Sequence, residues 1–395
     1  MPDQIHLAVA LEGAGWHSAA WRAPDSQPGD LLTARYWSAL VAEAERGLVD
    51  FVTIEDGLAL QSEDQLRADE RTDRVRGRLD AVLIAARVAP LTHHIGLLPT
   101  AVATHTEPFH LSKAIATLDY VSSGRAGVRV QVTGSPAVAG HFGRRQIAEL
   151  PASGFDSPEG RALAEQLLRE AGDYIEVLRR LWDSWEDDAE IRDGVTGRFI
   201  DRDKLHYIDF EGPWFSVKGP SITPRPPQGQ PIVATLGHGE PAYRLAATGA
   251  DVAFVTPRSA REAAQIVSTL GSLRPAGLDP IRVFADLVVF LADTADAAAQ
   301  RRARLDDLAG TEFSSDAAVF VGTPEQLADL VQEWHAAGLA GLRLRPGTLP
   351  HDLRQITTAL VPELQRRGVF RTGYSTTTLR ETLGLARPAN RYAPV

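Results

Sequence analysis

The chain has 395 residues, with 41 basic and 51 acidic side chains and a formal net charge of −10. This length suits one large α/β barrel with insertions or two ordinary domains. The acidic balance argues against a nucleic-acid or membrane-surface partner, because no basic stripe is present to neutralise phosphates. The sequence contains no cysteine, which excludes disulfides, thiolate catalysis and cysteine-ligated metals and is compatible with a reducing cytoplasm.

The opening residues, MPDQIHLAVALEG, lack the basic start and the long apolar core of a secretory signal peptide. No window of the sequence reaches the roughly 18 consecutive apolar residues that a membrane-spanning helix needs. We therefore expect a cytoplasmic enzyme, with an interaction protein as the alternative.

Short apolar runs alternate with amphipathic segments along the whole chain. The runs predicted as buried strands are 5–11, 49–54, 95–102, 126–132, 231–236, 251–255, 283–291 and 341–345. The helices predicted between and after them include 79–90, 159–183, 323–337 and 351–367. Strands that alternate with helices in this way, without an internal repeat or an interdomain linker, favour an α/β fold of the (β/α)8 TIM-barrel type over an open sheet.

The stretch 134–230, between the fourth and fifth predicted strands, does not fit this simple alternation. It contains the strongly amphipathic helix predicted at 159–183. It also contains two β-prone pieces, HYIDF and WFSV, which flank a Gly-Pro turn and predict a hairpin. We interpret residues 1–395 as a single barrel domain with an insertion at about 134–230.

Polar residues collect where the predicted strands end, which is where ligands bind in parallel α/β proteins. Glu55 and Asp56 follow the second strand, and Thr100 and His105 lie at the end of the third. Another candidate is His17, which follows the first strand beside two tryptophans and could form a pocket wall.

The segment LGHGEPA places Gly237, His238 and Gly239 between the fifth strand and a helix. Bare glycines let a phosphate approach the N–H groups at a helix start, and an imidazole adds a donor. The segment also matches the dinucleotide fingerprint G-x-G-x-x-A, but Thr256 and Pro257 stand where that fingerprint needs an acidic residue. We therefore favour a phosphate cradle at the fifth strand over a Rossmann domain.

Arg129 lies among valines within the fourth strand. Because a strand alternates its faces, Arg129 points away from the side of Val128 and Val130. A buried guanidinium needs an anionic partner. Two kinds of partner remain open: a carboxylate of Glu55 or Asp56, or a ligand phosphate or the electron-rich end of a reduced ring.

The histidines do not form a metal-binding set. His105 and His110 are five residues apart, whereas three or four residues separate side chains that share a helix face. The sequence also lacks an HExxH motif and a GxSxG elbow. We therefore expect no metal, and we disfavour metal-dependent hydrolysis and acyl-enzyme chemistry.

Longer pieces of sequence carry a family resemblance. They are GWHSAAWR (15–22), LDYVSSGRAG (118–127), LWDSWEDDA (181–189), KLHYIDFEGPWFSVKGPSITPRPPQGQP (204–231) and VPELQRRGVFRTGYSTTTLRETLGLARPANRY (361–392). In these pieces the chain resembles the flavin-dependent monooxygenases of the bacterial luciferase-like superfamily. The match is to the branch of nitrilotriacetate monooxygenase, dibenzothiophene sulfone monooxygenase and the pristinamycin synthase subunit.

The resemblance implies a TIM barrel that binds reduced FMN (FMNH2) at its C-terminal mouth, forms a homodimer or higher homo-oligomer, and receives its cofactor from a separate NAD(P)H:flavin reductase. Family chemistry adds O2 to the reduced flavin and oxidises a small organic substrate through a flavin hydroperoxide. By position, Asp56 and Thr100 match flavin contacts of the family, and His17 matches its loop over the pocket. His17, His105 and Arg129 are the candidates for catalytic pocket residues.

The chain departs from the family pattern at several positions. Arg129 stands where the family usually has Asn, and Ala164 and Leu168 stand where it has a His-x-x-x-Tyr pair. His238 and Gly239 replace the paired serines that hold the FMN phosphate. The side chains that hold the phosphate in the family have therefore changed.

Three hypotheses follow from these departures. In the first, the site is rebuilt around FMN, with Arg129, His238 and the backbone of Gly237 to Gly239 as new contacts, in an FMNH2- and O2-dependent monooxygenase. In the second, the barrel uses a deazaflavin coenzyme, as a dehydrogenase or reductase. In the third, it is a catalytically silent partner protein. The first hypothesis is our main expectation.

Overall fold

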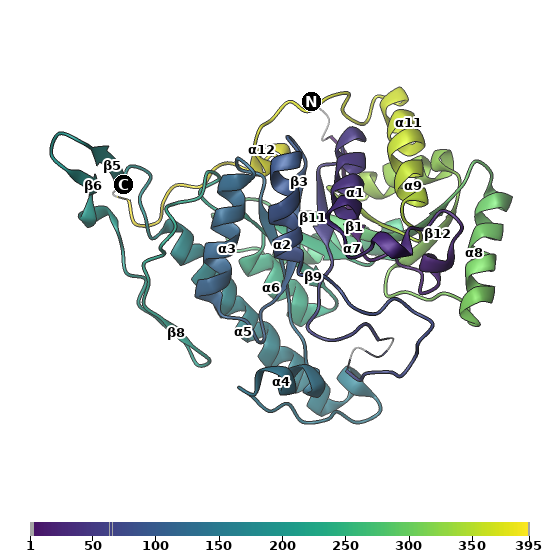
Figure 1. Ribbon diagram of the computed structural model, residues 1–395, viewed down its shortest axis with the longest axis horizontal. Helices are drawn as coiled ribbons and strands as arrows, with labels where there is room; N and C mark the ends of the chain where they lie inside the picture. The colour runs from purple at the N-terminus through teal and green to yellow at the C-terminus, as the bar shows by residue number, and fades with distance from the viewer. Residues whose placement is uncertain (1–3, 63, 65, 394–395) are drawn as a thin grey trace.

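The central feature of the computed structural model, which describes residues 4–62, 64 and 66–393, is a closed barrel of parallel strands (Figure 1). The strands pair in the order β10, β9, β4, β3, β2, β1, β13, β11, and pairing between β10 and β11 closes the ring. The barrel strands are β1 (His6–Leu11), β2 (Phe51–Ile54), β3 (Gly96–Val102), β4 (Gly127–Gln131), β9 (Ile232–Gly237), β10 (Val252–Val255), β11 (Arg282–Leu291) and β13 (Gly341–Pro346). All the predicted strands are present, and the predicted (β/α)8 barrel is confirmed.

One further parallel strand, β12 (Ala318–Gly322), lies outside the ring and pairs with the C-terminal half of β11, from Leu287 to Leu291. From the sequence we predicted the helix 323–337 after this stretch but no strand within it. The reason is that AVFVG is short and mostly half-buried, so its pairing depends on the unusual length of β11.

Helices follow most of the barrel strands. They are α1 (Ala34–Arg46), α2 (Ala81–Val88), α3 (Pro108–Val121), α4 (Pro136–Phe142), α5 (Pro158–Asp183), α6 (Glu240–Gly249), α7 (Ala260–Leu273), α8 (Ala295–Ala309), α9 (Pro324–Ala336), α10 (His351–Gln355), α11 (Val361–Arg366) and α12 (Leu379–Thr382). Many begin at a side-chain cap; Asp80, for example, accepts a hydrogen bond from the Leu83 N–H at the start of α2. Among the described residues, no helix is both long and apolar enough to cross a membrane.

Several short helical turns complete the chain. They are the 3-10 turns η1 (Ala20–Arg22), η2 (Pro28–Asp30), η3 (Ala89–Leu91), η4 (Gly154–Asp156) and η5 (Arg202–Lys204) and the π-helical turn η6 (Ile356–Leu360). The predicted helix 351–367 is formed by α10, η6 and α11 in succession, so its extent is confirmed but its regularity is not.

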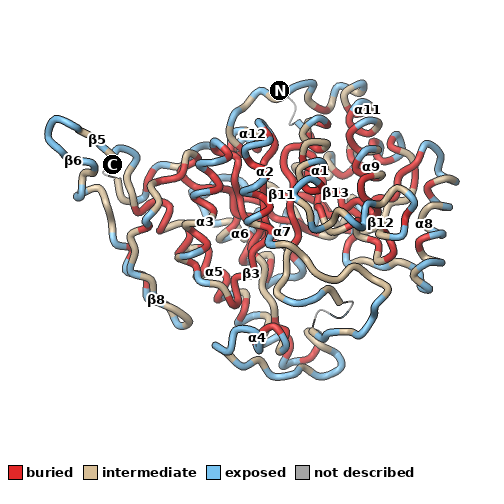
Figure 2. Tube along the Cα trace, in the orientation of Figure 1, coloured by how far each residue is buried: buried red, intermediate tan, exposed pale blue. Residues whose placement is uncertain are grey.

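The chain between β4 and β9 holds α4, α5 and two hairpins that project away from the barrel (Figure 1). The hairpin predicted from HYIDF and WFSV is the pair β7 (Phe210–Glu211) and β8 (Ser216–Val217). The other hairpin, β5 (Glu190–Asp193) with β6 (Arg198–Ile200), was not predicted, and neither was α4. Figure 2 shows that β5 and β6 are largely exposed, whereas the barrel is buried.

The N-terminal end of the barrel interior is closed by aromatic side chains. Phe51, Phe254 and Phe284 are fully buried, and their ring centroids lie 5.3–6.2 Å apart. Leu379 and Leu383, from α12 and the residue after it, pack against the same cluster. The C-terminal tail therefore seals this end of the barrel.

Above the aromatic layer, the barrel interior holds charged side chains. Arg343 donates to both carboxylate oxygens of Asp286, at 2.6 and 2.5 Å, and its guanidinium lies 4.0 Å from the centre of the Phe254 ring. Arg345 also donates to Asp286. Burial alone would raise the pKa of Asp286, but the two guanidinium groups lower it below its usual value.

We expect Phe284→Ala to lower the free energy of unfolding by about 3–5 kcal/mol, because it leaves a cavity at the centre of the aromatic layer. Phe199→Ala, at a position in β6 that is 61% exposed, is the control and should change it by less than about 0.5 kcal/mol. Urea denaturation followed by circular dichroism measures both. Equal effects of the two substitutions would contradict this description of the core.

We also expect Asp286→Asn to lower the free energy of unfolding by about 3–5 kcal/mol at pH 7, since it removes the buried charge between two arginines. A carboxylate with a lowered folded-state pKa stabilises the fold above its unfolded pKa. The difference from wild type should therefore shrink as the pH falls below the usual value of 3.8. The control is Glu240→Gln, in an exposed pair with Arg244 that is worth about 0.3–0.5 kcal/mol. A loss no larger than the control's would contradict the expected role.

Candidate active site at the barrel mouth

The C-terminal ends of the barrel strands form one mouth, and most of the predicted site residues lie around it. Asp56 follows β2, Thr100 lies in β3, Arg129 in β4, and His238 directly follows β9. The chain folds this way because parallel strands place all their carboxyl ends at the same end of the barrel.

Arg129 points into the barrel and is 4% exposed. It donates to the carboxylate of Glu55, from Nε to the Thr100 hydroxyl at 2.9 Å, and to the side-chain carbonyl of Gln131 at 3.0 Å. Burial alone would raise the pKa of Glu55, but the guanidinium groups of Arg129 and Arg343 hold it below its usual value. Of the partners left open by the sequence, the structure shows the Glu55 carboxylate.

Glu55 also joins Arg129 to the charged groups deeper in the barrel. Its second oxygen accepts from Arg343 at 3.2 Å, Arg343 binds Asp286, and Asp286 binds Arg345. From Arg345 the series continues to Asp316, at 2.6 Å, in the loop before β12. We call this series, from Arg129 through Glu55, Arg343, Asp286 and Arg345 to Asp316, the interior ion-pair chain.

Asp56 lies at the start of the loop after β2. One carboxylate oxygen accepts from its neighbour Gly57 N–H at 2.7 Å, and the other accepts from the Ala81 N–H, at the start of α2, at 2.9 Å. Burial raises the pKa of Asp56. Nearby, Glu12 after β1 is paired with Arg78 at 2.6 Å. The wall of the mouth at β1 and β2 is therefore acidic and well ordered by hydrogen bonds.

The turn between β9 and α6 has the features of a phosphate cradle. Gly239 is the N-cap of α6 with φ of +80°, a conformation that favours glycine, and no side chain caps this helix start. A Cβ at Gly237 would lie 2.9 Å from the Tyr243 ring, so glycine is also needed there for close packing. Backbone N–H groups at the helix start thus remain available to an anion.

His238 stands in this turn with 46% of its side chain exposed. Its Nδ1 lies 3.2 Å from the Thr256 hydroxyl, and its Nε2 lies 3.5 Å from Asp316. Burial alone would raise the pKa of Asp316, but hydrogen bonds from His238 and Arg345 lower it far below its usual value. The imidazole is therefore held between a hydroxyl and a firmly ionised carboxylate.

Arg129 and His238 lie at different depths of the barrel. The register of β4 and β9 pairs Arg129 with Ala234, and His238 lies four residues further toward the mouth. At about 3.3 Å per residue this is a separation of roughly 13 Å along the strands. The interior ion-pair chain connects the two residues, but they do not converge on one point.

His17 and His105 are both buried but lie in different surroundings. The Nδ1 of His17 accepts from the Ala19 N–H at 3.0 Å, its Nε2 lies 3.0 Å from Asp306, and its ring stacks on Phe313. The ring of His105 stacks on Phe142, and its Nε2 is buried without a hydrogen-bond partner. Burial lowers the pKa of both histidines. His17 is therefore a fixed wall residue, whereas His105 retains a free ring nitrogen.

Four members of the interior ion-pair chain were not predicted: Arg343, Asp286, Arg345 and Asp316. Arg343 and Arg345 alternate with leucines in GLRLR, which is the signal that marked Arg129, so they could have been found. Asp316 lies in a polar loop and had no such signal. Within the described parts of the chain, no group of three or more His, Cys, Asp or Glu side chains is arranged to hold a metal ion.

Comparison with known proteins agrees with this geometry. A sequence profile of the luciferase-like monooxygenase family matches residues 15–311. The chain is 32% identical to N-acetyl-S-(2-succino)cysteine monooxygenase of Bacillus subtilis (strain 168), covering 99% of this chain and 98% of that protein. It is 29% identical to nitrilotriacetate monooxygenase component A of Aminobacter aminovorans, again covering 99% and 98%.

Solved structures show the same fold. The structure of a long-chain alkane monooxygenase superposes with a TM-score of 0.83 at 24% identity, covering 97% of this chain and 96% of that one. The structure of a riboflavin lyase with modified FMN and riboflavin has a TM-score of 0.81 at 25% identity, covering 96% of each chain. Because the family profile spans more than half of the sequence and the barrel has the architecture of these relatives, the chain belongs to the luciferase-like monooxygenase family.

Proposed function

We propose that this chain is the oxygenase component of a two-component monooxygenase that uses FMNH2 and O2 to oxidise a small organic molecule. The observation that carries the proposal is the uncapped turn of Gly237, His238 and Gly239 at the C-terminal mouth of the barrel. The reaction class is supported by relatives named as monooxygenases that align over nearly the whole chain.

The residues at the mouth fit a phosphate joined to a polar ring. The glycine backbone supplies N–H donors at the helix start, and the half-exposed His238 beside it would exchange its 3.5 Å contact with Asp316 for a contact with a phosphate monoester. On the neighbouring strands β4 and β3, Arg129 and Thr100 supply further donors, and Asp56 after β2 supplies an acceptor toward the ring. Bound FMNH2 would supply the electrons that activate oxygen.

In this proposal the protein orients its ligands and controls water and protons. Thr256 orients the His238 ring toward the phosphate position. His105 is the candidate proton carrier, because its Nε2 is buried without a partner. His17, with both ring nitrogens engaged, would help to exclude water.

A reductase partner belongs to the same proposal. One relative is named as a component of nitrilotriacetate monooxygenase, and two others are named as different subunits of pristinamycin IIA synthase, so each is one part of a larger system. We propose that a separate NAD(P)H:flavin reductase supplies FMNH2 to this chain, and that the chain works as a homodimer or higher homo-oligomer.

We expect His238→Ala to weaken anaerobic FMNH2 binding about tenfold, the effect of losing one charge-assisted hydrogen bond of about 1.4 kcal/mol. The affinity for reduced riboflavin, which has no phosphate, should stay unchanged. Fluorescence titration under anaerobic conditions measures both dissociation constants.

The matched control is His110→Ala, at an exposed position on α3. It should bind both flavins as wild type does. Equal weakening of FMNH2 and reduced riboflavin in His238→Ala would contradict the phosphate contact. If no flavin binds to the wild type at micromolar concentrations, the monooxygenase proposal fails in favour of a silent barrel. Tight binding of a deazaflavin, with turnover that consumes no oxygen, would instead favour a dehydrogenase.

A further inference from the structure

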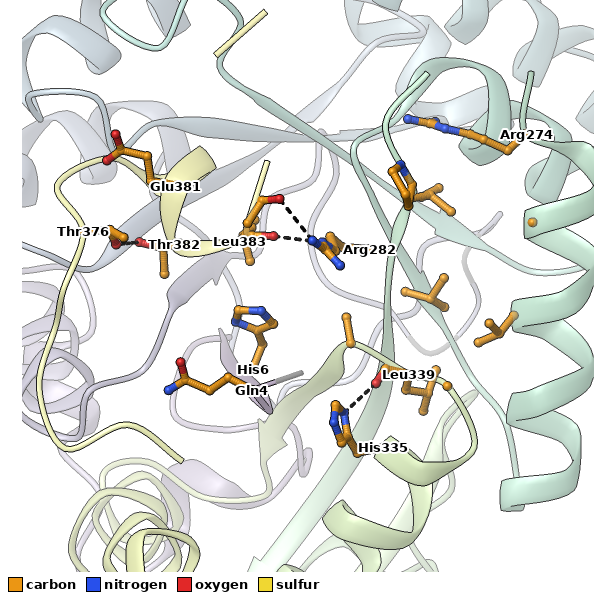
Figure 3. A pocket seen from close by; sticks show the side chains of 18 of the residues that line it. Gln4, His6, Arg274, Arg282, His335, Leu339, Thr376, Glu381, Thr382 and Leu383 are labelled. Atoms are coloured by element: carbon orange, nitrogen blue, oxygen red, sulfur yellow. Dashed lines mark hydrogen bonds between the residues drawn. The ribbon is translucent and has the colours of Figure 1, made fainter. Parts of the chain in front are cut away.

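A cavity of about 800 Å³ lies at the N-terminal end of the barrel, opposite the mouth (Figure 3). It is bounded by the starts of β1, β11 and β13, by the last turns of α7, and by the C-terminal tail at 371–384. Its volume is in the range of pockets that hold small organic ligands. The proposed monooxygenase reaction does not use it.

The cavity wall is rich in arginine, although the chain as a whole is acidic. Arg274, Arg282 and Arg371 line the cavity, whereas the chain as a whole carries a net charge of −10. The acidic residue in the wall, Glu381, is engaged at the start of α12, where it accepts from the N–H groups of Thr377 and Thr378. The wall is therefore locally cationic and favours an anion.

Arg282 and Arg371 have hydrogen-bonding capacity to spare. Arg282 donates from Nε to the Leu383 carbonyl at 2.8 Å and from Nη2 to the Gly384 carbonyl at 3.1 Å. It has no ion pair with any carboxylate of the described chain. Arg371 donates to Asp50 through Nη2, and its side chain is only 9% exposed. Its Nε is buried and has no hydrogen-bond partner among the described residues. A ligand in the cavity can reach the exposed 9% of the Arg371 side chain, whereas the orphaned Nε is shielded from the cavity.

Arg274 supports the same conclusion. Its guanidinium donates to the backbone carbonyls of Ala247, Ala250 and Asp279, which are neutral acceptors. Burial lowers the pKa of Arg274, and the nearby carboxylates of Asp251 and Asp279 offset the cost of the buried charge only in part. An anion in the cavity would supply that compensation.

The rest of the wall is mainly apolar or hydroxylic, and it also includes the polar side chains of Gln4, His6 and His335. Val267, Leu278, Ile281 and Leu339 give it an apolar side. On the tail side the hydroxyls of Thr376 and Thr382 bond to each other at 2.7 Å, and Figure 3 shows this pair across the cavity from His335. A wall that is cationic at one end and apolar on one side suits a molecule with an anionic head and an apolar body.

We propose that this cavity binds a small amphiphilic organic anion, whose carboxylate or phosphate head faces Arg282 and Arg371 and whose apolar body packs against Val267, Leu278 and Leu339. The two head groups share the chemistry that an arginine fork recognises. The site is separate from the proposed flavin site, because the two lie at opposite ends of the barrel strands.

Isothermal calorimetry with octanoate, octyl phosphate and 1-octanol tests the proposal on the full-length protein. We expect the wild type to bind at least one of the two anions about tenfold or more tightly than the neutral alcohol. The tighter anion identifies the head group. Arg282→Gln should weaken that anion about tenfold and leave the alcohol unchanged. Equal affinity for anion and alcohol, or no binding of either anion at millimolar concentration, would overturn the proposal.

A second variant tests the location without removing a charge. A Cβ at Gly271, on the cavity side of α7, meets no atom within 4 Å, so Gly271→Phe should fill the space without straining the helix and abolish anion binding. The control is Arg161→Gln, an exposed arginine that donates to the backbone carbonyl of Asp156 and lies outside the cavity. It should bind as wild type does.

Two measurements distinguish a misfolded variant from a wrong proposal. Thermal melts check that Arg282→Gln and Gly271→Phe remain folded. His238→Ala should bind the anion as wild type does, and weaker binding in that variant would place the anion at the barrel mouth and overturn the proposal. Unchanged anion binding in a folded Gly271→Phe protein would also overturn the proposal.

Discussion

The interior ion-pair chain is the interaction on which the rest of this structure depends. Moving charged groups out of water is expensive, and a buried charge is tolerated only beside an opposite one. Here three arginines alternate with three carboxylates, so each inner member contacts charges of the other sign on both sides. The members come from the residue after β2, from β4, β11 and β13, and from the loop before β12. The chain of charges therefore ties together strands that are distant in the sequence.

The pairing of charges inside the barrel determines which groups at the mouth can contact a ligand. Arg129 is matched by Glu55, so its positive charge is largely used within the protein. The donors that we propose for an anion lie instead in the backbone between β9 and α6 and in His238. Two of the predicted departures from the family pattern thus lie in different surroundings: Arg129 belongs to a charge network in the interior, and His238 is half-exposed at the mouth.

The sequence predicted the barrel strands better than the side-chain contacts inside the barrel. Each barrel strand is a short, mostly apolar segment, because both of its faces are buried, and such segments are visible without a structure. The same is not true of β12, whose half-buried residues pair only because β11 extends past the barrel. A strand of this kind is determined by its neighbour and not by its own composition.

The candidate site could also be predicted only in part from the sequence. Alternation within the strand placed Arg129 on the face opposite Val128 and Val130, and the cost of a buried guanidinium required an anionic partner. The choice between Glu55, Asp56 and a ligand depended on side-chain geometry across two strands. Asp56 turned out to be engaged with the backbone at the start of α2. Asp316 lies nearly two hundred residues from Arg129 in the sequence, so no local pattern connects them.

β11 is the longest strand of the barrel, and its length has a consequence beyond packing. Its first residue, Arg282, lines the N-terminal cavity, its fifth, Asp286, lies in the interior ion-pair chain, and its last five pair with β12 beside the loop that carries Asp316. One continuous ladder of backbone hydrogen bonds therefore runs from the cavity to the mouth. Amide hydrogen exchange along this single strand would report local opening at both ends of the barrel in one measurement.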